Sequence, residues 1–316
     1  MKNPDRRKIS FVIACYNSEK SLAAVVDEIS DVLEKDGYSY EIILVNDGSA
    51  DNTMQVINQL CEANSKVIGV ELSKNFGQHN AMMAGFSFAA GDLIFYSDDD
   101  GQCPVDQYLR FVEKIDEGYD MVYAEYPTQK RGLLNGIGAN VNNRMLKFIF
   151  NKPLDLNFGN LWVSKRYVIE EALKCNNPRV HLGGLFLTIT TNMANVSCEK
   201  RNRLSGDSNY SFFKLVMIWL NALTAFSIAP LRVASITGGI IALLGMVYMV
   251  YLIVFKLIYG NLLIGYSSIM SVILFIGGML MMMIGIVGEY IGRISSNLNS
   301  LPQFVVKQKI NVKNDR

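Results

Sequence analysis

The sequence predicts an α/β domain built on a mainly parallel sheet, followed by a helical membrane region. Between residues 9 and 125, short runs rich in β-branched and aromatic residues alternate with helical segments. This is the pattern of strands joined by crossover helices. Charged residues recur up to about Tyr210, whereas Lys256 is the one charged residue between Val233 and Gly288. The chain therefore divides into a globular part and an apolar part.

The predicted strands and helices of the globular part alternate along the chain. The strands are expected at Ile9–Cys15, Glu41–Val45, Val67–Leu72, Leu93–Tyr96 and Met121–Tyr123. The helices between them are expected at Glu19–Lys35, Asn52–Ala63, Gln78–Ala89 and Val105–Glu117. In such a sheet, ligands bind beyond the carboxyl ends of the strands. We therefore expect the ligand-binding residues in the segments that follow the strands.

Two long apolar runs, Val233–Phe255 and Ser267–Gly288, predict a pair of transmembrane helices. Each is long enough as a helix to reach about 33 Å, and a hydrocarbon core is about 30 Å thick. Arg232 precedes the first run and Arg293 follows the second, whereas the loop between them carries only Lys256. The positive-inside bias then predicts a hairpin in the inner membrane, with the catalytic domain and both termini in the cytoplasm.

The segment before the first apolar run predicts an interfacial helix. Its apolar residues recur at near-helical spacing, Lys214 interrupts them, and Pro230 ends the segment. Glycines in both apolar runs would let the helices pack closely, within one hairpin or between protomers of a homo-oligomer. The four predicted parts are a cytoplasmic domain at 1–210, the juxtamembrane helix at 211–230, the transmembrane hairpin at 231–290 and a cytoplasmic basic tail at 291–316.

Composition excludes several classes of protein. The formal net charge of +1 gives no general attraction for nucleic acid. The five cysteines form no CxxC pair and are expected to be reduced thiols of a cytosolic domain. The N-terminal apolar run is too short for a signal peptide, so we expect the domain to remain on the side where it is made.

Polar clusters follow four of the predicted strands. They lie at residues 16–19, 46–51, 73–79 and 98–102. The first strand is not followed by the glycine-rich loop of a dinucleotide site, and no GxxxxGK[ST] sequence is present. These clusters are expected to meet at one edge of the sheet and to form a different kind of ligand site.

The last of these clusters predicts a metal site. Asp98, Asp99 and Asp100 end a buried strand, which is costly unless a positive charge lies among them. Asp98 and Asp100 point the same way in an extended chain. With Gln102 they offer the oxygen ligands that suit Mg²⁺ or Mn²⁺. From spacing alone, a solvated acidic turn is the alternative.

Five motifs then occur in a recognisable order. Residues 14–18, 45–51 and 72–77 correspond to P-x-Y-N-E, V-D-D-G-S-x-D and L-S-[RK]-N-x-G; residues 98–102 and 203–210 correspond to D-x-D-x-Q and R-x-x-G-[ED]-S-x-Y. With the C-terminal hairpin, nearly the whole chain resembles glycosyltransferase family 2, which has the GT-A fold. The resemblance is to polyprenyl-phosphate glycosyltransferases such as dolichyl-phosphate mannose synthases and undecaprenyl-phosphate glucosyltransferases.

The resemblance implies an inverting, metal-dependent hexosyltransferase at the cytoplasmic membrane face. Its donor would be a nucleotide sugar, with a UDP-hexose favoured, and its acceptor a polyprenyl phosphate, with undecaprenyl phosphate favoured. The implied donor-binding residues are Tyr16, Asn17, Asp47 at the base, Lys74 and Asp98. The implied metal ligands for Mg²⁺ or Mn²⁺ are Asp98, Asp100 and Gln102. The catalytic residues would be Asp98, Asp99, Asp100 and Arg203, and the acceptor phosphate would meet Arg203, Ser208, Tyr210, Lys130 and Arg131.

The chain departs from the family pattern at several positions. Ala14 and Ser18 replace the proline and glutamate of the first motif, and Tyr126 and Trp162 stand where relatives carry arginines that handle the acceptor phosphate. Two alternative functions follow. A processive polysaccharide synthase shares the nucleotide site, but its Q-x-x-R-W motif is absent from the chain. A non-enzymatic membrane scaffold with a degenerate domain would not need the intact acidic motif.

Overall fold

The computed structural model describes residues 7–126, 156–178, 180–199, 201, 266–298 and 302–312, with scattered positions between 236 and 258. The chain divides into two compact units. One is formed by Met1–Ser211 with Leu301–Arg316, and the other by Phe212–Ser300. The candidate site lies in the first unit.

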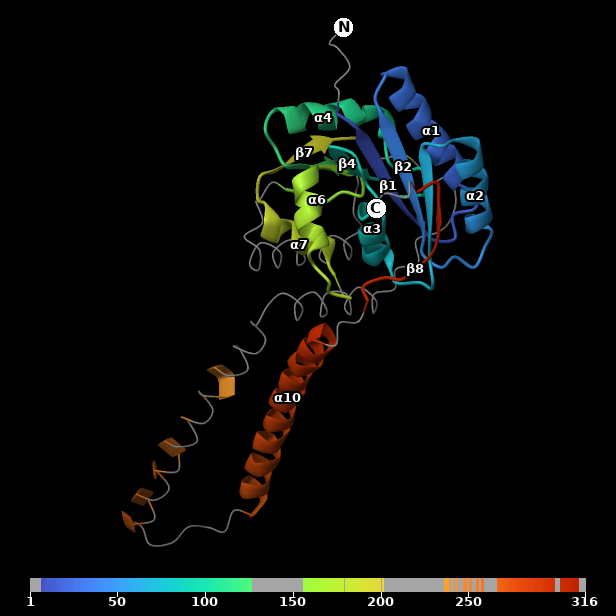
Figure 1. The fold of residues 1–316 in the computed structure, drawn as a ribbon. Helices are drawn as coiled ribbons and strands as arrows, with labels where there is room; N and C mark the ends of the chain where they lie inside the picture. The colour runs from blue at the N-terminus through green and yellow to red at the C-terminus, as the bar shows by residue number, and fades with distance from the viewer. Residues whose placement is uncertain are drawn as a thin grey trace. The chain divides into compact units, whose positions relative to one another are not determined.

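An eight-stranded sheet forms the centre of the first unit, in the order β7-β5-β6-β4-β1-β2-β3-β8 (Figure 1). Strands β1–β5 and β7 run in one direction, and β6 and β8 run antiparallel to their neighbours. The mainly parallel α/β sheet predicted from the sequence is confirmed. The strands are β1 (Ile9–Cys15), β2 (Tyr40–Asn46), β3 (Val67–Leu72), β4 (Leu93–Tyr96), β5 (Met121–Glu125), β6 (Trp162–Lys165), β7 (Met193–Ser197) and β8 (Val306–Ile310).

Helices cover both faces of this sheet. Helices α1, α2 and α4 lie on one face and α3, α6 and α7 on the other (Figure 1). The side chains of each group belong to a separate apolar cluster. The helices are α1 (Leu22–Lys35), α2 (Thr53–Ala63), α3 (Gln78–Phe86), the 3₁₀ turn η1 (Val105–Gln107), α4 (Tyr108–Asp116), α6 (Arg166–Leu173) and α7 (Leu182–Ile189). The four helices predicted between the first five strands are confirmed in position.

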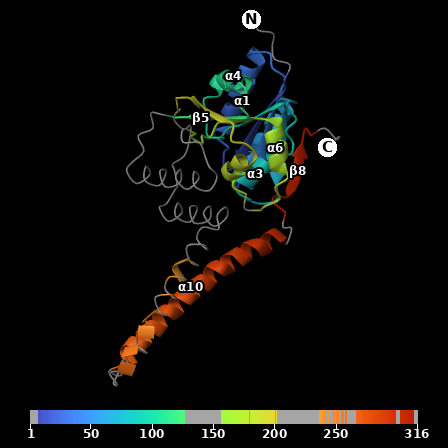
Figure 2. The ribbon, with the colours of Figure 1, turned by 90° about the vertical axis from the view of Figure 1, so that its left-hand side faces the viewer.

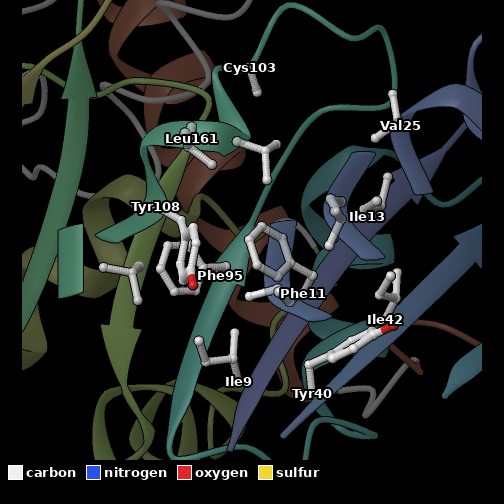
Figure 3. Packing of buried hydrophobic residues seen from close by; sticks show 14 of the residues in the cluster. Ile9, Phe11, Ile13, Val25, Tyr40, Ile42, Phe95, Cys103, Tyr108 and Leu161 are labelled. Atoms are coloured by element: carbon white, nitrogen blue, oxygen red, sulfur yellow. The ribbon is translucent and has the colours of Figure 1, made fainter. Parts of the chain in front are cut away.

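Alternation along β1 explains why the strand has two buried faces. Ile9, Phe11 and Ile13 join the cluster under α1 and α4, whereas Val12 joins the cluster under α3. Phe11 stacks on Phe95 of β4 with ring centroids 4.7 Å apart, as the close view in Figure 3 shows. Full burial of one such side chain stabilises a fold by about 1.5–3 kcal/mol. The strand is thereby fixed, and its polar carboxyl end is held at the sheet edge.

The C-terminal strand β8 closes the β3 edge of the sheet and was not predicted from the sequence. Ser73 N–H donates to the Val305 carbonyl at 2.9 Å, and Asn311 Nδ2 donates to the carbonyls of Cys61 and Val67. Lysines alternate on the exposed positions of this edge strand, which discourages pairing with another chain. The predicted basic tail therefore includes a strand that supports the loop after β3.

The second unit contains α10 (Tyr266–Leu298), a helix of 33 residues that includes the second predicted span (Figure 2). Its apolar side chains are largely exposed, for example Met281 at 75% and Ile284 at 68%. Within the residues that the structure describes, no helix meets the combined length and hydropathy needed to cross a membrane. The first predicted span is described only at scattered positions, and the predicted interfacial helix at 211–230 lies outside the described residues.

Candidate active site

The carboxyl ends of β1, β2 and β4 bring three predicted polar clusters into contact. Tyr16 N–H donates to Asp99 Oδ2 at 3.2 Å, which joins the loop after β1 to the turn after β4. Asn17 N–H donates to Ser49 Oγ at 3.0 Å, which joins the same loop to the loop after β2. The predicted convergence of these clusters at one sheet edge is confirmed.

The loop after β1 is held in a sharp turn that presents an aromatic ring. Asn17 has a φ of +56°, and asparagine is among the residues that tolerate this left-handed region. Asn17 Oδ1 accepts from Ala50 N–H at 2.9 Å, which stabilises the turn. The Tyr16 side chain is 52% exposed. A half-exposed ring at the carboxyl edge of the sheet is available to stack on a planar ligand.

Asp47 holds the loop after β3. The side chain is buried, Oδ1 accepts from Phe76 N–H at 2.7 Å, and Oδ2 accepts from Gly77 N–H at 2.9 Å. Burial raises the pKa of Asp47, while the two N–H groups oppose the rise. Both oxygens are therefore engaged within the protein. The contact with the nucleotide base implied for Asp47 remains a prediction.

Gly48 lets the loops after β2 and β3 pack directly on each other. It has a φ of +65°, and an added Cβ would lie 2.6 Å from Asn75 N and 2.7 Å from the Lys74 carbonyl carbon. The position therefore requires glycine on both conformational and steric grounds. Lys74 follows on an exposed part of the loop, with Nζ 5.2 Å from the Phe76 ring centroid. Its charge lies on the same sheet edge as the acidic turn.

The acidic turn, defined here as Asp98–Gln102, begins with a partly buried carboxylate that accepts three hydrogen bonds. Asp98 Oδ1 accepts from Gln78 Nε2 at 3.1 Å and from Tyr96 OH at 2.9 Å, and Oδ2 accepts from Asn160 Nδ2 at 2.8 Å. Burial raises the pKa of Asp98 to about 6, the donors from Asn160 and Tyr96 oppose the rise, and the charges of Asp100 and Asp99 add to it. All three hydrogen-bond donors are uncharged, so they orient this carboxylate without neutralising it.

Asp99 faces a different part of the site. Its Oδ2 accepts from the Ser18 hydroxyl and from Tyr16 N–H. Burial raises the pKa of Asp99, and these two donors oppose the rise. Its carboxylate therefore lies against the loop after β1, and the catalytic role implied for Asp99 remains a prediction.

Asp100 completes the turn. Its Oδ1 accepts from Gln102 N–H at 3.0 Å, and Gly101 has a φ of +74°, which reverses the chain between them. Among the described residues, no group of three or more His, Cys, Asp or Glu side chains is placed to hold a metal ion. Metal ligation by Asp98, Asp100 and Gln102 remains a prediction.

Trp162 lies beneath the acidic turn rather than in a phosphate site. It is 4% exposed and stacks on Tyr96 with ring centroids 5.7 Å apart. Phe86 and Phe186 each make an edge-to-face contact with the Trp162 indole. A position this apolar does not suit an arginine that must reach a phosphate. Trp162 supports Tyr96, and Tyr96 in turn donates to Asp98.

Asn160 and Gln78 are site residues that the sequence analysis missed. Asn160 Nδ2 reaches Asp98, and Asn160 Oδ1 accepts from Tyr126 OH at 2.9 Å. Gln78 Nε2 also donates to Tyr96 OH at 2.7 Å. Tyr126 therefore joins a neutral hydrogen-bond chain that ends at the acidic turn. Both amides belong to segments that the sequence had already indicated. Gln78 lies in the polar cluster after the third predicted strand, and Asn160 lies two residues before Trp162, where relatives carry an arginine.

All five predicted acceptor residues lie outside the described residues; these are Lys130, Arg131, Arg203, Ser208 and Tyr210. The nearest described arginine in sequence, Arg201, is engaged in ion pairs with Glu28 at 2.7 Å and Asp106 at 2.6 Å. The backbone N–H of Arg201 also donates to the Gln102 carbonyl. Arg201 therefore anchors the chain beside the acidic turn, two residues before Arg203.

The two histidines pack against each other near α3 and α7. Their ring centroids are 5.4 Å apart, His79 Nδ1 accepts from Leu182 N–H at 3.2 Å, and His181 Nδ1 accepts from Gly184 N–H at 3.1 Å. Burial lowers the pKa of both, and the charge of His181 contributes to lowering that of His79 to about 4. Both rings accept backbone hydrogen bonds as neutral imidazoles, which is a structural use.

Two family models match the chain. Residues 10–175 match the model described as Glycosyl transferase family 2, and residues 229–294 match the model described as GtrB C-terminal hairpin. The first covers the sheet edge that carries the polar clusters, from the loop after β1 to the acidic turn. The second covers both predicted spans.

Similar proteins extend over nearly the whole chain. An undecaprenyl-phosphate 4-deoxy-4-formamido-L-arabinose transferase of Klebsiella pneumoniae (strain 342) is 32% identical over 97% of this chain and 95% of its own length. The enzyme of the same name from Proteus mirabilis (strain HI4320) is also 32% identical, over the same shares. Among solved structures, glucosyl-3-phosphoglycerate synthase from Mycobacterium tuberculosis has a TM-score of 0.49 at 18% identity, covering 70% of this chain and 79% of that one.

Proposed function

The chain belongs to glycosyl transferase family 2, and we propose that it transfers one sugar from a nucleotide sugar to a polyprenyl phosphate. The observation that carries the proposal is the end-to-end similarity to undecaprenyl-phosphate transferases, which includes the C-terminal segment as well as the catalytic domain. Undecaprenyl phosphate is the proposed acceptor. The proposed donor is a UDP-hexose; the names of the relatives favour a second candidate for the transferred sugar, 4-deoxy-4-formamido-L-arabinose.

The acidic turn fits a hard divalent cation. Asp98 and Asp100 offer carboxylate oxygens, the ligands that Mg²⁺ and Mn²⁺ prefer. The raised pKa of Asp98 records a burial and charge cost that a cation would relieve. Three of the lone pairs of Asp98 already accept protein hydrogen bonds, so we assign the larger share of direct ligation to Asp100. Such a cation, when bound, would stabilise the charge on the nucleoside diphosphate as it leaves.

The acceptor itself simplifies the remaining chemistry. A phosphate monoester has a second pKa of about 6, so its oxygen is already ionised near pH 7. The protein therefore needs to orient the anion and offset its charge rather than remove a proton. Arg203 is the proposed partner of that phosphate, and Arg201 holds the chain two residues before it beside the acidic turn. Attack from the face opposite the leaving group would invert the anomeric centre.

We place the enzyme in the inner membrane, with the catalytic domain and both termini in the cytoplasm. The match to the hairpin family spans both predicted helices. At one point the described parts of the two apolar segments touch closely, because a Cβ on Gly238 would lie 2.3 Å from Met283 Cε. Single cysteines at Asn261 and Asn314, treated with an impermeant maleimide in intact cells, test this topology. Labelling at position 261 alone is expected, and labelling at 314 alone would contradict it.

A transfer assay tests the reaction. Purified protein, undecaprenyl phosphate and Mn²⁺ are combined with radiolabelled UDP-glucose, UDP-galactose, UDP-N-acetylglucosamine or the UDP-linked formamido-arabinose. One donor is expected to label the lipid, with a single sugar on each polyprenyl phosphate. A growing polymer would instead indicate a processive synthase. No lipid product from any donor, with Mn²⁺ or Mg²⁺, would contradict the proposal.

A further inference from the structure

The carboxylates of Asp98 and Asp99 have different hydrogen-bond partners. The partners of Asp98 come from β4, from α3 and from the segment just before β6, namely Tyr96, Gln78 and Asn160. The partners of Asp99 come from the loop after β1, namely Ser18 and Tyr16. A third adjacent negative charge adds repulsion to the turn. We therefore expect Asp99 to have a role other than metal ligation.

The loop after β1 carries a serine where the family motif has a glutamate, and the neighbouring Glu19 does not replace it at this contact, because Glu19 Oε2 accepts from Asn52 N–H and Nδ2. Position 18 is glutamate in P-x-Y-N-E and serine in this chain. Ser18 is only 5% exposed, and its hydroxyl donates to Asp99 Oδ2. A glutamate at position 18 is two carbons longer, so it would extend its carboxylate into the volume that Asp99 fills. The D-x-D motif leaves its middle position unspecified, and this chain places aspartate there.

We propose that Asp99 supplies, from the turn after β4, the carboxylate that the motif supplies from position 18. Asp99 is then a positioning residue, which fixes the loop after β1 and through it the ring of Tyr16. This inference rests on the proposed function in one respect, that the ligand placed by Tyr16 is the donor nucleotide.

Hydrogen bonds hold the loop after β1 from two sides, and Asp99 accepts the bonds on one of these sides. On the β2 side, Ser49 accepts from Asn17 N–H and Ala50 N–H donates to Asn17 Oδ1. On the β4 side, Asp99 Oδ2 accepts from Ser18 and from Tyr16 N–H. Without Asp99 the second side is open, although Tyr16 N–H also reaches Ser18 Oγ at 3.1 Å. Loss of Asp99 should therefore weaken donor affinity more than it lowers kcat.

A two-residue exchange tests the proposal. The variants are Asp99→Ala, Ser18→Glu and the double variant Ser18→Glu/Asp99→Ala, each purified as the full chain. The first readout is calorimetric affinity for UDP with Mn²⁺, and the second is kcat at saturating donor. Asp99→Ala is expected to weaken UDP binding about tenfold, because the loop loses one side. Ser18→Glu is expected to weaken it by at least as much, because two buried carboxylates then meet.

The double variant decides the question. It again has one carboxylate at the contact between the loop after β1 and the acidic turn, so UDP affinity is expected to return to within about threefold of wild type. Independent sites would instead multiply the two losses to about a hundredfold, and that result overturns the proposal. Asp99→Asn, which keeps an acceptor oxygen, should fall between wild type and Asp99→Ala. Asp116→Ala, at a carboxylate paired with Arg7 on the surface, is the matched control and should bind UDP as wild type does.

Failure of the proposed function has a different signature. If wild-type protein binds no UDP in Mn²⁺ or Mg²⁺, the donor assignment fails for every variant alike. The same four proteins can still be compared by thermal unfolding without ligand. A double variant more stable than both single variants supports the exchange, and one less stable than both contradicts it.

Discussion

Two loops at the same edge of the sheet use carboxylates in opposite ways. After β2, Asp47 accepts from two backbone N–H groups of one loop, so peptide dipoles stabilise its charge. After β4, Asp98 accepts only from uncharged side chains and lies beside two further aspartates, and its pKa rises to about 6. Backbone groups of the fold already stabilise the charge of Asp47, whereas a bound cation would further stabilise the charge of Asp98. The two carboxylates therefore differ in what stabilises their charge, backbone N–H groups for Asp47 and neutral side chains for Asp98.

The largest expected effect is on catalysis, at the acidic turn. Asp100→Ala should remove at least about 3 kcal/mol of transition-state stabilisation, comparable to deleting a key electrostatic group. The thermal midpoint should stay near the wild-type value, because a like charge is removed from beside Asp98. Transfer rates with excess Mn²⁺ and a thermal scan of the same preparation provide both measurements. More than a tenth of wild-type activity in the variant would show that Asp100 is not essential to the site.

The next effect is expected on stability, in the loop after β2. Asp47→Ala leaves the N–H groups of Phe76 and Gly77 without their charged acceptor. Hydrogen bonds to charged groups contribute about 1.5–3 kcal/mol each, so the loss of both should lower the free energy of unfolding by about 3–6 kcal/mol. Asp47→Asn keeps one acceptor oxygen and should lose about half as much. Thermal midpoints equal to wild type in both variants would refute the structural assignment of Asp47.

The next prediction concerns Arg203→Ala, which tests the proposed binding of the acceptor phosphate. A charge-assisted contact with phosphate is typically worth about 1.5–3 kcal/mol. The KM for polyprenyl phosphate should therefore rise, or the transfer rate fall, roughly ten- to a hundredfold, while UDP affinity with metal stays within about threefold of wild type. Arg203→Lys should recover only part of the loss, because lysine lacks the bidentate fork.

A matched arginine variant controls for general loss of charge. Arg166 pairs with Glu170 on the surface of α6, so Arg166→Ala should leave acceptor kinetics unchanged. If Arg203→Ala abolishes UDP binding and spares acceptor kinetics, Arg203 belongs to the donor site. The acceptor phosphate would then be sought at Lys130 and Arg131.

The smallest expected effect is a pH dependence from the histidine pair. Burial and the neighbouring His181 lower the pKa of His79 to about 4, whereas an unfolded histidine titrates near 6.5. The stability contributed by neutral His79 is thus complete above pH 6.5 and is lost as the pH falls toward 4. His79→Asn keeps an acceptor for Leu182 N–H but cannot titrate. Between pH 7 and 5, wild type should lose about 1–2 kcal/mol more than this variant; parallel stability curves would disprove the assignment.

The sequence was sufficient for the sheet core and the acidic turn, because both are encoded locally. Strands such as Ile9–Cys15 are nearly continuous apolar runs, and the spacing of Asp98 and Asp100 is a property of five residues. Strand β8 was missed because Val306–Ile310 carries polar residues at three of its five positions, as an exposed edge strand does. Such a segment gives no apolar signal strong enough to predict pairing.

The long-range partners of the site were not predictable for a related reason. Gln78 and Asn160 bond to Asp98 across 20 and 62 residues of sequence. Their contacts depend on the packing order of β4, β6 and α3, and their own neighbours in sequence do not encode it. The position of Trp162 shows the same limit, since its place in the core was evident only from the rings around it.

Calorimetric titration of UDP into the full chain in detergent tests most directly whether the acidic turn is a cation site. The titration is made with Mn²⁺ and again with EDTA, for wild type and for Asp100→Ala. Wild type is expected to bind UDP at least tenfold more tightly with Mn²⁺, a difference of about 1.4 kcal/mol, and Asp100→Ala to lose that difference. Equal affinity of the wild type in Mn²⁺ and EDTA, or an undiminished Mn²⁺ effect in Asp100→Ala, would contradict the account.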